Sequence, residues 1–160
     1  MLRCIKKFFK RIYNLIYYLI MGYPLPKYHF SVQWGGTNIG FTEVSGLDIN
    51  IDVIEYRSGS SPVQSVTKMP GLVKYSNIIL KRGIVKGDTD FYKWVRTVNQ
   101  STAERRDVVI SLLNENHEPV MTWKVRNAFP AKYCGPDLNA QSSEVAIETL
   151  ELAHEGLTVE

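Results

Sequence analysis

A single amphipathic segment constrains the fold most, because the other patterned stretches after residue 21 all predict strands. Phe91, Trp94, Val95 and Val98 recur at the i, i+3, i+4, i+7 spacing of one buried helix face. Asp88 precedes them where a helix N-cap is expected. One short helix among strands predicts a mainly β fold. We expect two packed β-sheets forming a barrel-like body, with this helix on its flank.

The strands are predicted from short runs in which apolar and polar residues alternate. Pro70 and Gly71 predict a turn, and Gly35 and Gly36 predict a hairpin. Prolines and a glycine within residues 129–138 predict a bend. The expected strands are residues 28–34, 38–44, 47–56, 75–82, 107–113, 119–128 and 144–153.

The strand at residues 47–56 alternates cleanly between apolar and polar side chains. Its apolar residues are Ile49, Ile51 and Val53. Its polar residues are Asp48, Asn50 and Asp52. This pattern predicts one packed face and one face in contact with water.

Two segments lack a helix or strand pattern. Residues 22–27 contain Pro24 and Pro26, which predict an extended arm. Residues 57–70 are polar and rich in serine, and a loop of this length inside a compact domain is uncommon. The loop is either a mobile surface loop or one that becomes ordered against another subunit.

The first twenty residues differ in composition from the rest of the chain. They hold five of the 19 basic residues and no acidic one, whereas the other 140 carry 14 basic and 16 acidic residues. Their apolar stripe opposite the cations is typical of a helix that lies on an anionic membrane. A signal peptide is a second reading, and translation from Met21 is a third. We therefore divide the chain into a basic amphipathic segment, residues 1–20, which the third reading places outside the native fold, and a domain of residues 21–160.

No constellation of catalytic, cofactor-binding or metal-binding residues is evident. His29, His117 and His154 have no second ligand at metal spacing, and Cys4 and Cys134 form no disulfide framework. The net negative charge of residues 21–160 argues against a nucleic-acid binder. We expect a protein that is not an enzyme and needs no cofactor, and that instead builds an assembly from its own copies.

Several stretches in order resemble the tail tube proteins of T4-like contractile phage tails and related contractile injection systems. They include YPLPKYHFSVQWGGTNIGFTEVSGLDINIDVIEYRSG, PGLVKYSNIILKRGI, DFYKWV and RRDVVISLLNENHEPVMTWKVRNAFPAKYCGPDLNAQSSEVAIETLELAHEGL, and they leave residues 1–20 unmatched. The resemblance implies hexameric rings that stack into a hollow tube. The implied partners are sheath and baseplate proteins, with cargo or DNA in the lumen.

The resemblance also implies assembly in the cytoplasm, followed by incorporation into a virion tail or an injection particle. The alternative is a ring or carrier protein of the haemolysin-coregulated type from type VI secretion, which looks like a relative of this fold. We expect residues 57–70 to become ordered on assembly and residues 1–20 to be dispensable for it.

The implied assembly assigns roles to two sets of residues. The candidate lumen-facing residues are Asp48, Asn50 and Asp52, although the same row could face bulk solvent. The candidate inter-subunit residues are Tyr23, Pro24, Leu25, Pro26, Arg57, Ser58, Gly59, Ser60, Ser61, Pro62 and Val63. A polar, mildly negative wall would not bind DNA tightly or by sequence, since nonspecific affinity needs cations.

Overall fold

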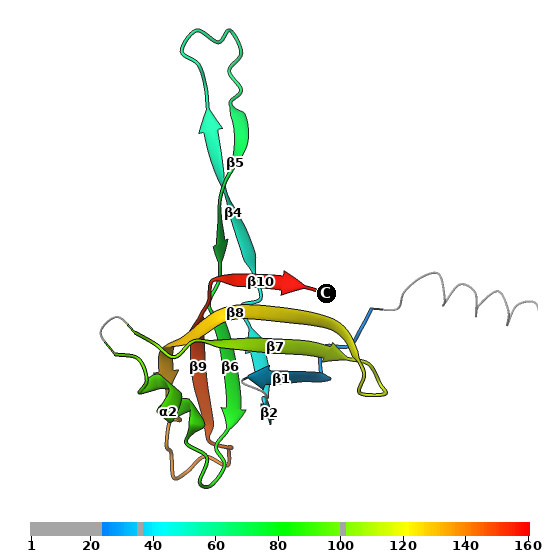
Figure 1. The fold of residues 1–160 in the computed structure, drawn as a ribbon, viewed down its shortest axis with the longest axis vertical. Helices are drawn as coiled ribbons and strands as arrows, with labels where there is room; N and C mark the ends of the chain where they lie inside the picture. Colours follow the sequence, from blue (N-terminus) through cyan, green and yellow to red (C-terminus); the bar gives the residue numbers. More distant parts are fainter. Residues whose placement is uncertain (1–23, 35–36, 100–101) are drawn as a thin grey trace, which may run out of the picture.

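The computed structural model describes residues 24–34, 37–99 and 102–160, and it shows a β-rich body from which one long hairpin projects (Figure 1). The predicted Gly35–Gly36 turn, Tyr23 and the amphipathic segment at residues 1–20 lie outside the described residues. The strands before the helix are β1 (Phe30–Trp34), β2 (Thr37–Ile39), β3 (Glu43–Ser45), β4 (Ile49–Tyr56), β5 (Thr67–Tyr75) and β6 (Ile78–Gly83). Helix α2 (Asp90–Val95), β7 (Arg106–Leu113), β8 (Pro119–Cys134), β9 (Ile147–Ala153) and β10 (Gly156–Val159) follow.

Strand β8 joins the two sheets of the body. The strand order is β2-β1-β7-β8-β9-β6-β3, with β10 also paired to β8. The first half of β8 pairs with β7 and β10, and its second half pairs with β9. Asn127, at φ 53°, marks the change of partner, and Asp107 Oδ1 accepts its backbone N–H at 2.9 Å. The 16 residues of β8 are therefore long enough to serve both sheets.

The body consists of packed sheets rather than a closed barrel. Strands β2 and β3 stand at opposite ends of the strand order, yet only residues 40–42 separate them in the chain. Four Cα–Cα steps join Ile39 to Glu43 and span at most about 14 Å, so the two ends must approach each other. The barrel-like shape thus comes from curling of the sheets, without ladder pairing between β2 and β3.

The core is built where helix α2 meets the sheets. Phe91 and Trp94 are fully buried, as the helical spacing predicted, and Val95 packs against the same core. The Trp34 ring lies 4.7 Å from Trp94 and 5.2 Å from Phe91, with each pair edge to face. Such arrangements are favourable beyond simple burial of area. Val98 lies beyond the end of the helix and is exposed, so its predicted place on the buried face is wrong.

The start of the helix also differs from the prediction. The N-cap residue is Thr89, without a side-chain capping bond, rather than Asp88. The Asp88 carboxylate still accepts the backbone N–H of Asp90 at 3.0 Å. Asp88 therefore accepts a hydrogen bond from the first helical turn although it lies one residue before the N-cap. Its carboxylate also accepts hydrogen bonds from Arg82.

Several predicted strand boundaries are wrong for local reasons. Pro70 and Gly71 form no turn but lie within β5, so the irregular loop shortens to residues 57–66. The predicted strand 38–44 is split into β2 and β3, and residues 75–82 are interrupted at Ser76 and Asn77. Strand β8 runs on past Pro130. The short strand β10 was not predicted.

No helix in the described ranges is long and apolar enough to cross a membrane.

Candidate assembly surfaces

The β4–β5 hairpin presents its apolar side chains to solvent. All eight residues of β4 are exposed, including Ile49 at 47%, Ile51 at 56% and Val53 at 60%. The alternation predicted for residues 47–56 is present, but the expected packed face is not covered within this chain. An exposed row of large apolar side chains on an isolated ribbon is typical of a surface that another chain covers.

The pairing of the two strands gathers these residues on one face. Ile49 lies opposite Tyr75, Ile51 opposite Val73 and Val53 opposite Pro70. Directly opposite residues project to the same side of a sheet. The register shifts between Ile51 and Val53, so that β5 supplies an extra residue there without disturbing the alternation along β4.

Gly71 permits this bulge. A Cβ atom at Gly71 would lie 3.0 Å from the backbone oxygen of Asp52, closer than such contacts normally come. A side chain at this position would therefore push the neighbouring strand away by a few tenths of an ångström.

The opposite face carries the three candidate lumen residues, and it is less negative than the sequence implied. Asp48, Asn50 and Asp52 are all exposed and follow the same alternation. Lys74 Nζ lies 2.7 Å from Asp52 Oδ2 and offsets that charge. Beyond Asp52 this face becomes apolar at Ile54. The polar row therefore covers only the part of the hairpin near the body.

The loop at the tip of the hairpin contains the second group of candidate inter-subunit residues. The Arg57 guanidinium donates to the backbone oxygens of Val63 at 3.2 Å and Ser61 at 3.4 Å. Ser58 and Ser60 hydroxyls lie 3.0 Å apart. Residues 57–63 thus form one cluster, stabilised mainly by local polar contacts, at the end farthest from the body (Figure 1).

The described part of the candidate arm lies far from that tip. Pro24 and Leu25 are exposed and Pro26 is half-buried, and the chain then enters β1 through Lys27 and Tyr28. The two groups of candidate inter-subunit residues are therefore separate surfaces. Because the two surfaces lie far apart on one subunit, they can belong to one interface only if the arm of one copy meets the tip of another.

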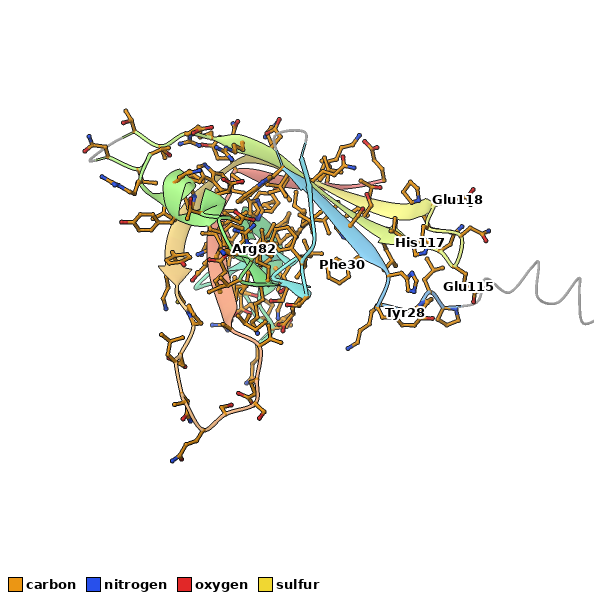
Figure 2. The ribbon with its side chains drawn as sticks, turned by 90° about the horizontal axis from the view of Figure 1, so that it is seen from below. Tyr28, Phe30, Arg82, Glu115, His117 and Glu118 are labelled. Atoms are coloured by element: carbon orange, nitrogen blue, oxygen red, sulfur yellow. The ribbon has the colours of Figure 1, made fainter. Side chains whose placement is uncertain are left out.

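A groove lies beside the arm. Lys27 and Tyr28 line it together with Phe30, Leu112 and Trp123, and its volume is about 620 Å³. Tyr28 and His117 are gathered at this end of the sheet, with Glu115 and Glu118 in the adjoining turn (Figure 2). This end combines an apolar groove with a polar rim.

A buried polar cluster inside the body was not predicted from the sequence. Arg82 is 3% exposed, and its Nε donates to Glu148 Oε1 at 2.6 Å. Its Nη1 and Nη2 donate to the two Asp88 oxygens at 2.7 and 3.1 Å. Its guanidinium carbon stands 3.9 Å from the Phe91 ring centroid. The Tyr133 hydroxyl donates to Glu148 Oε2 at 3.0 Å.

This cluster connects β6, β8 and β9 with the start of α2. Within the described ranges, no buried side-chain nitrogen or oxygen lacks a hydrogen-bond partner, and no three possible ligands are grouped for a metal. The backbone N–H of Asp90 lowers the pKa of Asp88, and Arg82 lowers it further. Burial raises the pKa of Tyr133, and its bond to Glu148 adds to that rise.

The lowered pKa of Asp88 predicts an acid-dependent loss of stability. A carboxyl group with a lowered pKa in the folded state stabilises the fold above its unfolded pKa, near 3.9, and this contribution disappears as the pH falls through the folded value. We expect Asp88→Asn to lower the free energy of unfolding by about 1–2 kcal/mol at pH 7. The difference from the unmodified chain should narrow below about pH 4.

Urea unfolding at several pH values measures this difference. Asp90→Asn is the matched control, because Asp90 is exposed and its Lys93 contact is 3.6 Å long. A gap between Asp88→Asn and the unmodified chain that stayed constant from pH 7 to pH 3 would contradict the assignment.

Comparison with known proteins places this chain in a family. Residues 26–158, most of the chain, match the family described as T4-like virus tail tube protein gp19. No curated protein sequence matches the chain. A chain of the PVC sheath–tube complex, an extracellular contractile injection system in its extended state, is 37% identical with a TM-score of 0.81. The match covers 88% of this chain and 93% of that one.

Two further solved structures resemble this chain to different degrees in sequence and fold. A chain of the anti-feeding prophage cap, which terminates the AFP tube, is 38% identical with a TM-score of 0.81, over 88% of this chain and 93% of that one. Hcp1 from Flavobacterium johnsoniae is only 15% identical, with a TM-score of 0.52 over 81% of this chain and 93% of that one, and it shares the fold alone. The family match and the tube-system relatives agree, and this chain belongs to the T4-like virus tail tube protein family.

Proposed function

We propose that this tail tube protein forms the inner tube of a contractile injection system or contractile phage tail, as hexameric rings that stack on one another. The observation that carries the proposal is the β4–β5 hairpin, whose apolar face is exposed in the single chain. Burial of apolar area is the main driving force of association, and it would be gained once per subunit in a ring or stack.

The hairpin tip and the arm are proposed to make different inter-subunit contacts. The tip at residues 57–63 lies far from the body, so it is suited to reach a neighbouring copy. Its local bonds are those of exposed polar groups, which contribute little stability by themselves. We therefore propose that this loop gains its final order on assembly, and that residues 23–26 contact a second neighbour.

The polar row on the hairpin is proposed to face the lumen. Asp48, Asn50 and Asp52 share one face, and Lys74 offsets part of its charge. Such a wall lacks the cation excess that holds phosphate backbones, so DNA or protein cargo could pass without sequence-specific binding. The subunit itself is proposed to have no catalytic activity.

The remaining partners are proposed from the assemblies in which the relatives occur. The similar chains come from a sheath–tube complex and a tube cap, and a 27% identical chain comes from a baseplate. Sheath and baseplate contacts are proposed here on that basis, with assembly in the cytoplasm before incorporation into a particle. The likeness to Hcp1 is one of fold alone and favours no separate carrier function.

Electron microscopy of the purified chain tests the proposal. We expect rings or stacked tubes from the full chain and also from a chain that begins at Met21, because the family match starts at residue 26. Sedimentation over a concentration series that showed only monomer for both chains would refute self-assembly. Tubes from the full chain alone would show that residues 1–20 are part of the architecture.

A further inference from the structure

The groove beside the arm leaves part of the hydrophobic core open to solvent. Its volume is about 620 Å³, and its lining residues come from the arm and from β1, β3, β7 and β8. Phe30, Val44 and Trp123 line it, and each packs against the buried core while remaining half-buried. Such a groove is stabilised when another apolar surface covers it and excludes water.

The same end of the body carries an excess of negative charge. Glu115 and Glu118 lie in the turn between β7 and β8, and Figure 2 shows both at the end of the sheet where Tyr28 lies. Neither glutamate forms an ion pair with another residue of the described ranges. Lys27 lines the groove and offsets one of these two charges, which leaves this end net negative.

The first twenty residues carry the complementary pattern. Their apolar residues recur at the spacing of one helix face, and they are Ile5, Phe8, Phe9, Ile12, Ile16 and Leu19. Their charged residues are all cations, and they are Arg3, Lys6, Lys7, Lys10 and Arg11. An apolar stripe flanked by cations matches an apolar groove with an acidic rim.

The chain itself brings this segment to the groove. Lys27 and Tyr28 line the groove, and residues 21–26 join them to residue 20. Seven Cα–Cα steps separate residue 20 from Lys27, and they span at most about 25 Å. A segment on so short a link meets its site at an effective concentration of about a millimolar, an advantage that a separate molecule in dilute solution lacks. The family match begins at residue 26, so it assigns no role to the first twenty residues.

We propose that residues 1–20 dock with their apolar stripe in the groove of their own chain, with their cations facing Glu115 and Glu118. Docking covers half-buried core side chains in the unassembled subunit, and it keeps the stripe from binding a membrane or another copy. The docked segment is not required for tubes, because a chain that begins at Met21 differs only in leaving the groove uncovered before assembly.

Photo-crosslinking of the full chain tests the docking directly. Benzoylphenylalanine in place of Phe9 puts a photoreactive ring on the stripe, and mass spectrometry locates its crosslinks. We expect crosslinks to groove residues, such as Leu47, Leu112 and Trp123. The same group in place of Asn14, on the opposite side of a helix, is the matched control and should lose them. An equal mixture of heavy-isotope and ordinary protein shows whether each crosslink lies within one chain.

Charge reversal at the rim tests the electrostatic part of the docking. Glu115→Lys combined with Glu118→Lys replaces two exposed acids, so the fold should be retained, and circular dichroism verifies it. The yield of groove crosslinks from position 9 should fall severalfold at low salt, and added salt should narrow the difference from the unmodified chain. Glu144→Lys changes an exposed acid in the loop before β9 and should leave the yield unchanged.

The proposal is overturned if position 9 crosslinks to no groove residue, or if position 14 crosslinks to the groove equally well. Groove crosslinks only between heavy and ordinary copies would also overturn it, because a second copy would then be the occupant. Flotation of the full chain with phosphatidylserine vesicles, without groove crosslinks in the vesicle-free sample, would instead assign the stripe to a membrane surface. A chain that sedimented only as monomer would refute the rings and leave these crosslinks unchanged, so the two proposals fail separately.

Discussion

Ile51→Asp is expected to abolish ring and tube formation while the protomer remains folded. Ile51 is 56% exposed in the single chain, so the protomer should change in stability by no more than about 0.5 kcal/mol. In an assembly that covers the apolar face of the hairpin, the new carboxylate would be buried without a partner, at a cost of several kcal/mol in each interface. Because every subunit in a ring carries the substitution, this cost recurs at every contact.

Electron microscopy and sedimentation measure the assembly, and thermal unfolding verifies the fold. Asn50→Asp is the matched control, because it adds a charge of the same sign one residue away on the polar face of the same strand. Tubes should persist in that variant. Normal tubes from Ile51→Asp, or equal loss of tubes from both variants, would show that the apolar face is not the inter-subunit surface.

The fold was predictable wherever a local pattern determines burial. Phe91 and Trp94 recur at helical spacing, and Ile78 and Leu80 alternate along β6, and all four are fully buried. The apolar face of β4 was also predicted, but alternation does not reveal which molecule covers a face. The packed face that the alternation predicts is exposed in the single chain, so this chain does not itself supply its cover.

The sequence-based predictions failed where contacts between distant parts of the chain, and not the local residue pattern, determine the structure. Pro70 and Gly71 are turn residues by composition, yet β5 belongs to a two-stranded ribbon, where both strands are edges and a bulge accommodates them. Strand β10 pairs with residues of β8 that lie between 30 positions (Arg126 with Gly156) and 36 positions (Trp123 with Val159) earlier, and its four residues are too few to show a period. The Arg82–Glu148 contact joins residues 66 positions apart, and no local motif signals it.

Arg82→Met is expected to lower the free energy of unfolding by about 3–5 kcal/mol, the largest stability effect that the structure predicts. The methionine side chain has about the volume of the aliphatic part of arginine. It lacks every N–H that the guanidinium donates to Glu148 and Asp88. Glu148 is 6% exposed, so its carboxylate would stay buried, and among the described residues the Tyr133 hydroxyl would be its remaining side-chain hydrogen-bond donor. Denaturant unfolding of the protomer measures the loss.

A more exposed ion pair, whose cation Lys81 directly precedes Arg82 on β6, provides the control. Lys81 Nζ lies 2.9 Å from Glu43 Oε2, with both side chains open to solvent. Such pairs contribute about 0–1 kcal/mol, so Lys81→Met should have a small effect. Equal losses from Arg82→Met and Lys81→Met would contradict the assignment of a buried ionic cluster.

A double substitution separates the cost of an unpaired charge from the loss of packing. Arg82→Met together with Glu148→Gln removes the buried cation and the carboxylate that it leaves behind, so part of the lost stability should return, although Asp88 still loses its partner. If the double variant were as unstable as the sum of the two single variants, the residues would act independently. Because the two side chains share a bond of 2.6 Å inside the body, we expect strong non-additivity instead.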